Sequence, residues 1–308
     1  MSKDYWYRLL FKVKLYEVAG EAFQHLVNSV LEATFPGFQS ITSWGNAGDG
    51  GNDGWVKDEG RYFQVYGPRA SSSWKPVPAA QKATEDFAKL KAQWSGMRRY
   101  TFVLNDRFDG IPAPVVQCLN NLESTRQVGR ADALGAAGQT DLFMALSEDR
   151  KMGITGGAPG DTLTDPEPSA LKEILQYLAD KDTPIPSAVV PVAPDFEEKI
   201  AFNQLPETIS TRLKTNSYHI TDVDAFFKGR DTWIAENIAE VLRGVYNECV
   251  VTIPAENDDA PALRYVLLLE KMVPKVAKSH PHSLKAYRQA AEMVVAKYFE
   301  ACDVYEKP

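Results

Sequence analysis

The sequence predicts an α/β domain, built on a small mixed sheet flanked by helices, followed by an all-helical C-terminal domain. Helical and strand-like periodicities alternate in residues 1–155, whereas residues 196–308 have helical periodicity almost throughout. Glycine and proline are concentrated at both ends of the segment between them, which predicts a linker with one helix over 156–195. A chain of 308 residues is long enough to bury two hydrophobic cores.

The first domain is expected to alternate helices and strands along the chain. Apolar residues recur every three or four positions in 20–34, which predicts a helix that Pro36 and Gly37 end. The segment 9–16 before it alternates loosely and fits either a strand or a helix. The order that follows is three strands, a helix, a strand and two helices, at 38–44, 53–57, 61–66, 79–94, 100–105, 113–125 and 138–149.

A glycine-rich stretch before the second of these strands carries the first candidate ligand. Residues 48–55 contain four glycines and two carboxylates, Asp49 and Asp53. Asp53 stands where the next strand begins and can be held rigidly, whereas Asp49 is expected to structure the loop. The alternative is a tight connection whose acids cap turns. A calcium loop of the EF-hand type fails, because its third and twelfth positions would be Gly51 and Gly60.

A second candidate ligand lies on the following strand. Period-two alternation places Gln64 on one face with Tyr62 and Tyr66, and the turn at 58–60 brings Gln64 close to the level of Asp53. Carboxylate and amide oxygens are hard ligands that suit Mg²⁺, with Mn²⁺ as an alternative cation. Asp53 and Gln64 are therefore the candidate metal ligands, and a half-exposed strand glutamine is the alternative interpretation of Gln64.

The order of these residues resembles the PD-(D/E)XK restriction-endonuclease-like nucleases, especially their Mrr-like and phage-defence branches. A helix with Glu21 precedes the glycine-rich stretch that ends at Asp53, and a strand with Gln64 follows; the resemblance covers residues 8–105. It implies a restriction-endonuclease-like α/β fold and a Mg²⁺-dependent endonuclease that hydrolyses phosphodiester bonds, most readily of double-stranded DNA. It also implies catalytic roles for Asp53, Gln64 and Glu21. Without it, Glu21 is equally explained as a first-turn acid stabilised by the helix dipole.

One position departs from the family pattern. Tyr66 stands where the family has lysine, and a phenol with a reference pKa of about 10 is neutral at pH 7. Nucleases of this type sometimes supply the lysine from the next helix, where Lys82 is the candidate catalytic residue. The alternative for Lys82 is a solvated lysine paired with Glu85 or Asp86. The alternative function is then a catalytically inactive nuclease-fold module that binds DNA or partner proteins.

The helical region carries a weaker resemblance. Residues 199–205, Trp233, Ile234 and Tyr246 are similar to the C-terminal domains of effector subunits in bacterial ABC-ATPase three-component defence systems, Lamassu among them. The resemblance implies a role in antiviral defence and docking to an SMC-like ABC ATPase. It also implies self-assembly into a homo-oligomer. Residues 196–308 are therefore expected to regulate the nuclease through oligomerisation or through the partner.

Charge and cysteine usage restrict the location and the partners. No apolar run approaches the roughly 18 residues that span a bilayer, and the N-terminus lacks the apolar segment of a signal peptide. The cysteines Cys118, Cys249 and Cys302 fit reduced thiols, so we expect a cytoplasmic protein without membrane contact. Residues 1–155 carry 18 Lys and Arg against 17 Asp and Glu, and the rest carries 16 against 24. DNA binding is therefore expected in the first domain.

Overall fold

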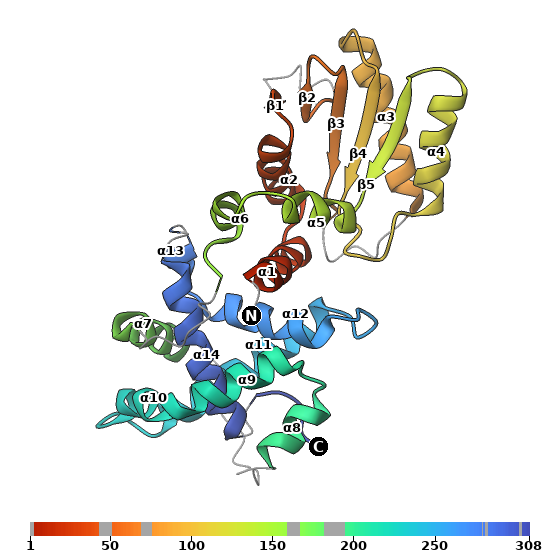
Figure 1. Cartoon of the computed structure of the whole chain (residues 1–308). Helices are drawn as coiled ribbons and strands as arrows, with labels where there is room; N and C mark the ends of the chain where they lie inside the picture. The colour runs from red at the N-terminus through yellow and green to blue at the C-terminus, as the bar shows by residue number, and fades with distance from the viewer. Residues whose placement is uncertain are drawn as a thin grey trace. The chain divides into compact units, whose positions relative to one another are not determined.

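A computed structural model describes residues 3–42, 51–68, 76–158, 167–181, 195–278, 280, 283–301 and 304–308. Its contacts divide the chain into two compact units. The sheet unit comprises Lys14–Ile154, and the helical unit comprises Met1–Val13 together with Thr155–Pro308 (Figure 1). The first helix, α1 (Lys3–Glu17), contributes residues to both units.

The sheet unit is built on one five-stranded mixed sheet. Its strands are β1 (Phe38–Ser40), β2 (Gly54–Val56), β3 (Arg61–Tyr66), β4 (Arg99–Leu104) and β5 (Arg130–Leu134), and they neighbour one another in sequence order. The pairs β1–β2 and β2–β3 are antiparallel, whereas β3–β4 and β4–β5 are parallel. The third strand is therefore central, with neighbours on both edges, and its first four residues are buried.

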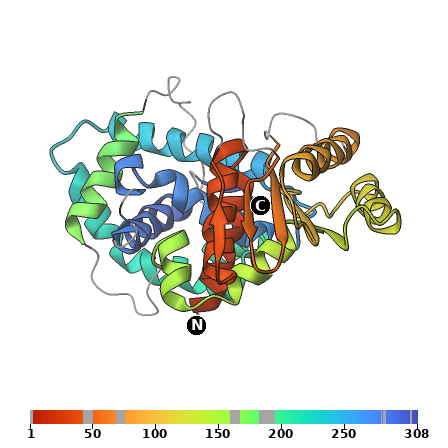
Figure 2. The ribbon, with the colours of Figure 1, turned by 90° about the horizontal axis from the view of Figure 1, so that it is seen from above.

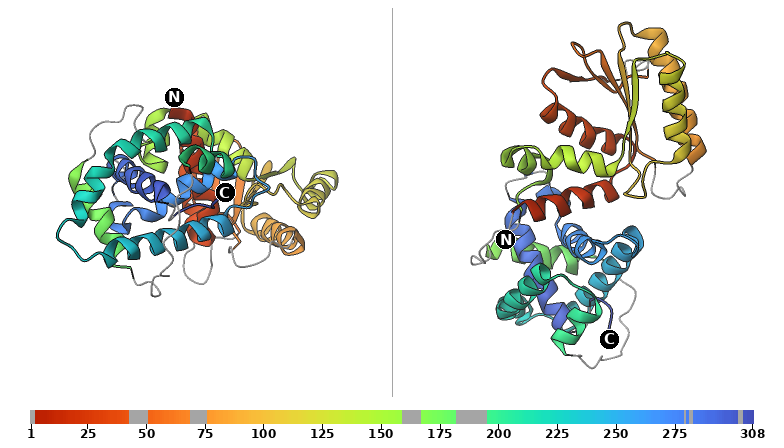
Figure 3. Two further views of the ribbon diagram at one scale, coloured as in Figure 1. Left: turned by 90° about the horizontal axis from the view of Figure 1, so that it is seen from below. Right: turned by 45° about the vertical axis from the view of Figure 1, so that its right-hand side comes forward.

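Helices cover both faces of this sheet. One face packs against α3 (Pro76–Gln93) and α4 (Ala113–Ser124), and Tyr62, Tyr100 and Phe102 face these helices in a shared core. The opposite face packs beside α2 (Gly20–Thr34). The right-hand view of Figure 3 shows α2 on one side of the strands, with α3 and α4 on the other. Two shorter helices, α5 (Ala136–Met144) and α6 (Glu148–Thr155), complete the unit along the chain.

The helical unit is arranged around α14 (Leu284–Glu300). This helix is buried along most of its length, including the polar side chains of Arg288, Gln289 and Glu292, and Figure 2 shows it enclosed by the other helices of the unit. Around it lie α7 (Pro168–Ala179), α8 (Phe196–Phe202), α9 (Glu207–Asn216), the 3-10 helix η2 (Ser217–His219), α10 (Ile220–Phe227), α11 (Trp233–Thr252), α12 (Ala260–Met272) and α13 (Lys275–Lys278). No helix in the described part of the chain is both long and apolar enough to cross a bilayer.

Buried ion pairs join α14 to its neighbours. Arg288 lies beside Glu270 of α12, with Nε and Oε1 2.5 Å apart, and it also donates to the carbonyl oxygens of Thr155 and Gly157. Glu292 pairs with Arg212 of α9, with Oε1 and Nε 2.5 Å apart. Because each charge has a partner of opposite sign, the interior of the helical unit tolerates them, and their geometry fixes how the helices meet.

The predicted small mixed sheet flanked by helices, followed by a helical C-terminal region, is confirmed. The segment 9–16, for which the sequence allowed strand or helix, belongs to α1, and the expected helix over 138–149 is two helices, α5 and α6. The strand β5 was not expected, because Arg-Ala-Asp-Ala-Leu has few of the β-branched and aromatic residues that mark a strand. The strand predicted over 38–44 runs through Ser40, and residues 43–50 of the glycine-rich stretch lie outside the described residues.

Candidate functional site

Asp53 is held firmly at the start of β2. Its backbone N–H donates to the Phe63 carbonyl and its carbonyl accepts from the Ile41 N–H, both at 3.0 Å, so the residue is fixed between two neighbouring segments. Its side chain is buried, and Oδ2 accepts a hydrogen bond from the Val65 backbone N–H at 2.7 Å. The carboxylate is thus oriented by the backbone of β3 rather than left to rotate in solvent.

Gln64 lies opposite Asp53 on β3. The strand register pairs Gly54 with Phe63, and one further step along this antiparallel pair sets Asp53 against Gln64. Gln64 is only 6% exposed, and its Oε1 has no hydrogen-bond partner among the described residues. A buried acceptor without a partner lowers the stability of the folded state by about 1–3 kcal/mol. A hydrogen-bond donor or a cation bound to this oxygen would remove that penalty.

Helix α2 reaches the site through Gln24, a residue that the sequence analysis did not identify. Its Nε2 donates to Oδ1 of Asp53 at 2.7 Å. Glu21, the predicted helix acid, has an 87% exposed side chain and lies 3.6 Å from His25. Gln24 is one helical turn after Glu21 and therefore on a similar face, which is the one signal in the sequence that points to it.

Lys82 and Asp86 form a pair on α3. Lys82 Nζ lies 2.7 Å from Asp86 Oδ1, and the lysine side chain is 40% exposed whereas that of Asp86 is 2% exposed. Lys89 Nζ approaches the same Oδ1 at 3.4 Å. The other oxygen of Asp86, Oδ2, is buried and has no hydrogen-bond partner among the described residues. The pairing matches the alternative in which Lys82 is held by an acid of its own helix.

The turn that leads into Asp53 packs directly on α3. Gly51 has a φ of +79°, and a Cβ atom there would lie 2.6 Å from the carbonyl oxygen of Asp86, so only glycine fits. Asn52 is fully buried, its Oδ1 accepts from the Gly54 N–H at 3.1 Å, and its Nδ2 is unpartnered within the described structure. This close approach brings Asp53 and Asp86 to the same end of the sheet unit.

Tyr100 of β4 lies within the electrostatic influence of both Asp53 and Asp86. Its hydroxyl donates to the Ala83 carbonyl of α3 at 3.0 Å. Burial raises the pKa of Tyr100 well above its ordinary value, and the negative charges of Asp86, Cys118 and Asp53 raise that pKa further. Both carboxylates therefore act on one phenol. We call Asn52, Asp53, Gln64 and Asp86 the polar cluster: four buried polar side chains where β2, β3 and α3 meet.

Several cations near the cluster have structural roles. The Arg61 guanidinium lies over the rings of Phe35 and Phe63, at 4.5 and 4.7 Å from their centroids, and burial lowers its pKa. Arg98 donates to the carbonyls of the turn before β3, and Arg99 pairs with Asp132 of β5. These residues hold the sheet together, so Lys82 and Lys89 are the described cations that lie beside the polar cluster.

The donor set fits a hard divalent cation better than a softer metal such as Zn²⁺ or Cu²⁺. Asp53, Gln64 and Asp86 offer two carboxylates and one amide oxygen, which is the type of donor that Mg²⁺ and Mn²⁺ prefer. Throughout the described residues, no three side chains of His, Cys, Asp or Glu converge in a way that would hold a metal ion. The buried and unpartnered Oε1 of Gln64 is an oxygen to which such a cation could bind.

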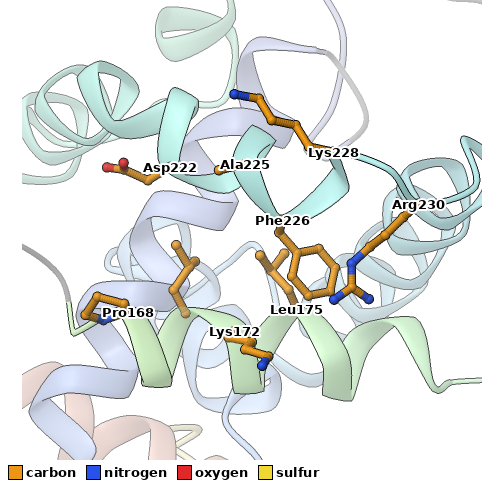
Figure 4. Close-up of a pocket in the computed structure, with 9 residues that line it drawn as sticks. Pro168, Lys172, Leu175, Asp222, Ala225, Phe226, Lys228 and Arg230 are labelled. Atoms are coloured by element: carbon orange, nitrogen blue, oxygen red, sulfur yellow. The ribbon is translucent and has the colours of Figure 1, made fainter.

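A second candidate surface lies in the helical unit. A cavity of about 610 Å³ opens between α7 and α10. Its lining combines apolar side chains with three cations and one acid: Pro168, Leu171, Leu175, Ala225 and Phe226 with Lys172, Lys228, Arg230 and Asp222. Arg230 lies over the Phe226 ring, with its Cζ 4.0 Å from the centroid (Figure 4). The cavity thus has a mixed apolar and predominantly positively charged lining.

Comparison with known proteins bears on the helical unit. Residues 169–306 match the family model of C-terminal domain 10 of the ABC-three component (ABC-3C) systems. The match extends from the start of α7 nearly to the C-terminus, and it includes the cavity between α7 and α10. No curated protein and no solved structure matches the chain. The C-terminal part of this chain is therefore similar to the C-terminal domains of the ABC-three component systems.

Proposed function

We propose that the sheet unit is a Mg²⁺-dependent endonuclease that cleaves DNA in anti-phage defence. The observation that carries this proposal is the pairing of a fixed, buried carboxylate, Asp53, with the buried and unpartnered amide oxygen of Gln64. The order of the sequence, which resembles that of PD-(D/E)XK nucleases, and the mixed sheet between helices support it further. Double-stranded DNA is the expected substrate, and Mn²⁺ is the alternative cation.

The metal ligands are prepared by hydrogen bonds from the protein. A bound Mg²⁺ would activate water for attack on phosphorus and neutralise charge on the phosphate. The Val65 N–H and the Gln24 amide each hold one oxygen of Asp53 and so fix the orientation of its carboxylate. Gln64 contributes Oε1 from the opposite strand, where its side chain is buried.

The positive charge of the active site comes from α3 in this proposal. Tyr66 stacks on Phe102, with ring centroids 5.9 Å apart, and a neutral phenol in that position cannot replace a lysine. Lys82 is half exposed beside the polar cluster, so its ammonium can meet an incoming phosphate while Asp86 fixes its position. Glu21, on the exposed face of α2, would act on the approaching substrate rather than on the metal held by Asp53.

A second candidate function is a nuclease-like domain that binds DNA or partner proteins without cleaving. The specific observation in its favour is the pairing of Lys82 with Asp86, because a lysine held in an ion pair is less free to contact a phosphate. Under either candidate, residues 169–306 would dock to the ABC ATPase component or assemble with further copies of the chain, and so control access to DNA.

The test is cleavage of supercoiled plasmid in Mg²⁺, with and without the ATPase component. The full chain should nick the plasmid, and Asp53→Asn should lose the activity by at least about 100-fold, because a required charge on the metal is lost. Asp58→Asn is the matched control, since Asp58 is an exposed acid in the turn between β2 and β3. Equal nicking by wild type and Asp53→Asn would overturn the assignment. Absence of nicking under all conditions would favour the non-cleaving candidate.

A further inference from the structure

Two buried oxygens of the polar cluster require the same kind of partner. Gln64 Oε1 and Asp86 Oδ2 are both acceptors, both are buried, and neither has a hydrogen-bond partner in the described structure. An acceptor is satisfied only by a donor or a cation, so each of these two oxygens requires one. The side chain of Asp86 is 2% exposed and meets both lysines through Oδ1, so Oδ2 is a buried acceptor with no donor of its own among the described residues.

The two oxygens come from elements that are pressed together at this end of the sheet unit. Gly51 packs on the Asp86 carbonyl, and two residues later Asp53 lies opposite Gln64. Tyr100 lies between α3 and the sheet, where it is affected by the carboxylates of both Asp86 and Asp53. The polar cluster thus draws its buried side chains from three separate segments.

We infer that Asp86 is a third protein ligand of the divalent cation, alongside Asp53 and Gln64. The inference rests on the proposed function. It gives the role of the helix acid to Asp86 of α3, whereas the sequence predicts Glu21 of α2 for that role. Glu21 is largely exposed and pairs with His25, whereas Asp86 is buried with one oxygen unpartnered. Three oxygens, two of them charged, are a suitable protein contribution for Mg²⁺, which usually keeps several waters.

The same carboxylate also fixes Lys82. Asp86 Oδ1 accepts from Lys82 Nζ at 2.7 Å, whereas Oδ2 remains for the cation. A carboxylate that bridges in this way holds the ammonium next to the metal, where the charge of a bound phosphate develops. Asp86 would therefore connect the metal to the lysine that replaces the one missing at Tyr66.

Calorimetric titration of the full chain with MnCl₂ and MgCl₂ tests the inference without relying on cleavage. Asp86→Asn should weaken Mn²⁺ binding at least about tenfold, because it removes a charged ligand but keeps the side-chain shape. Glu85→Gln is the matched control on the same helix, where Glu85 is exposed and bonded to Gln81. Near-ultraviolet circular dichroism of the aromatic residues around Tyr100 verifies that each variant is folded.

A second variant distinguishes two roles of Asp86, that of a metal ligand and that of an ion-pair partner that only positions Lys82. Lys82→Met should bind Mn²⁺ as tightly as the wild type or more tightly, because it removes an ammonium that competes for Asp86. Weaker binding by Lys82→Met, or wild-type binding by a folded Asp86→Asn, overturns the inference. If Asp53→Asn abolishes Mn²⁺ binding while Asp86→Asn does not, the proposed function stands and the role of Asp86 fails. If the wild type binds neither cation, both fail.

Discussion

Gln24 of α2 donates a hydrogen bond to Asp53, with Nε2 and Oδ1 2.7 Å apart. The neutral amide therefore orients the carboxylate without competing for its charge, and the Val65 N–H holds the second oxygen. Glu21, one helical turn earlier, lies at the surface, with its Oε1 3.6 Å from Nε2 of His25. In this structure α2 supports the candidate ligand through an amide rather than through an acid.

The first prediction contrasts these two residues of α2. Gln24→Ala should weaken Mn²⁺ binding by about tenfold, because loss of a residue that orients a ligand typically lowers metal affinity by about 10–100-fold. Glu21→Ala should leave Mn²⁺ affinity within about twofold, because an exposed charge is screened by solvent and salt. Calorimetric titration measures both affinities. A larger loss for Glu21→Ala than for Gln24→Ala would return the supporting role to the acid.

The second prediction concerns the unpartnered oxygen of Gln64. Gln64→Leu removes a buried acceptor, so without metal the variant should be as stable as the wild type or more stable, by up to about 1–3 kcal/mol. The same change should abolish the rise in melting temperature that Mg²⁺ or Mn²⁺ produces, because a ligand has been lost. Thermal melting with and without each cation measures both effects.

Gln64→Glu provides the opposite change at the same position. A carboxylate there should bind the cation more tightly, whereas the metal-free protein should become less stable because another charge joins Asp53 and Asp86. If the leucine and glutamate variants both lower the melting temperature and leave the effect of the cations intact, Gln64 is an ordinary strand residue and its predicted role is wrong.

Local signals in the sequence account for part of the site and not for the rest. The pairing of Asp53 with Gln64 across two neighbouring strands follows from a short turn and the period-two alternation of a strand, and both can be seen in the sequence. The contact of Gln24 and the burial of Asp86 depend on how α2 and α3 pack on the sheet. Neither residue type predicts such packing from the sequence. In the sequence, Asp86 looks like one member of an exposed ion pair on a helix. Its burial could not be predicted, because it depends on how the turn at Gly51 packs on α3.

The fold shows the same limit. The helices and the strands β3 and β4 are marked by strong periodicity or by apolar runs, so they could be predicted. The edge strand β5 could not, because its formation depends on pairing with β4 and on the Arg99–Asp132 ion pair rather than on its own composition. The N-terminal helix was ambiguous because buried residues occur at nearly consecutive positions, which leaves no clear period.

The third prediction concerns the buried ion pair of the helical unit. Arg288→Met should lower the free energy of unfolding by about 3–5 kcal/mol, because it leaves the buried Glu270 carboxylate without its guanidinium. The carbonyls of Thr155 and Gly157 also lose a donor. Urea unfolding monitored by circular dichroism measures the change.

An exposed ion pair of the same unit provides the control. Lys214 lies 2.7 Å from Glu197, and both side chains are well exposed. Lys214→Met should therefore change the free energy of unfolding by less than about 1 kcal/mol. Equal effects of Arg288→Met and Lys214→Met would contradict the view that the buried pair fixes the packing around α14.

The fourth prediction concerns alkaline pH and Tyr246 of α11. Its ring lies 4.3 Å from that of Tyr305, and burial raises its pKa to about 12, with a smaller contribution from the charge of Glu306. The folded state therefore keeps a proton that the unfolded chain releases above pH about 10. Stability should be unaffected by this residue below pH about 10 and should fall as pH rises towards 12, by up to about 1.4 kcal/mol per pH unit.

Tyr246→Phe isolates this contribution, because it removes the ionising group and keeps the ring that packs on Tyr305. Between pH about 10 and 12 the variant should lose stability less steeply than the wild type, by up to one proton's worth of slope. The remaining slope includes contributions from Tyr100, Tyr265 and Tyr305, whose pKa values burial also raises, and from Tyr287, whose pKa the hydrogen bond to Glu173 raises to about 12. Urea unfolding at a series of alkaline pH values measures the slopes, and identical slopes would show that Tyr246 ionises equally in both states.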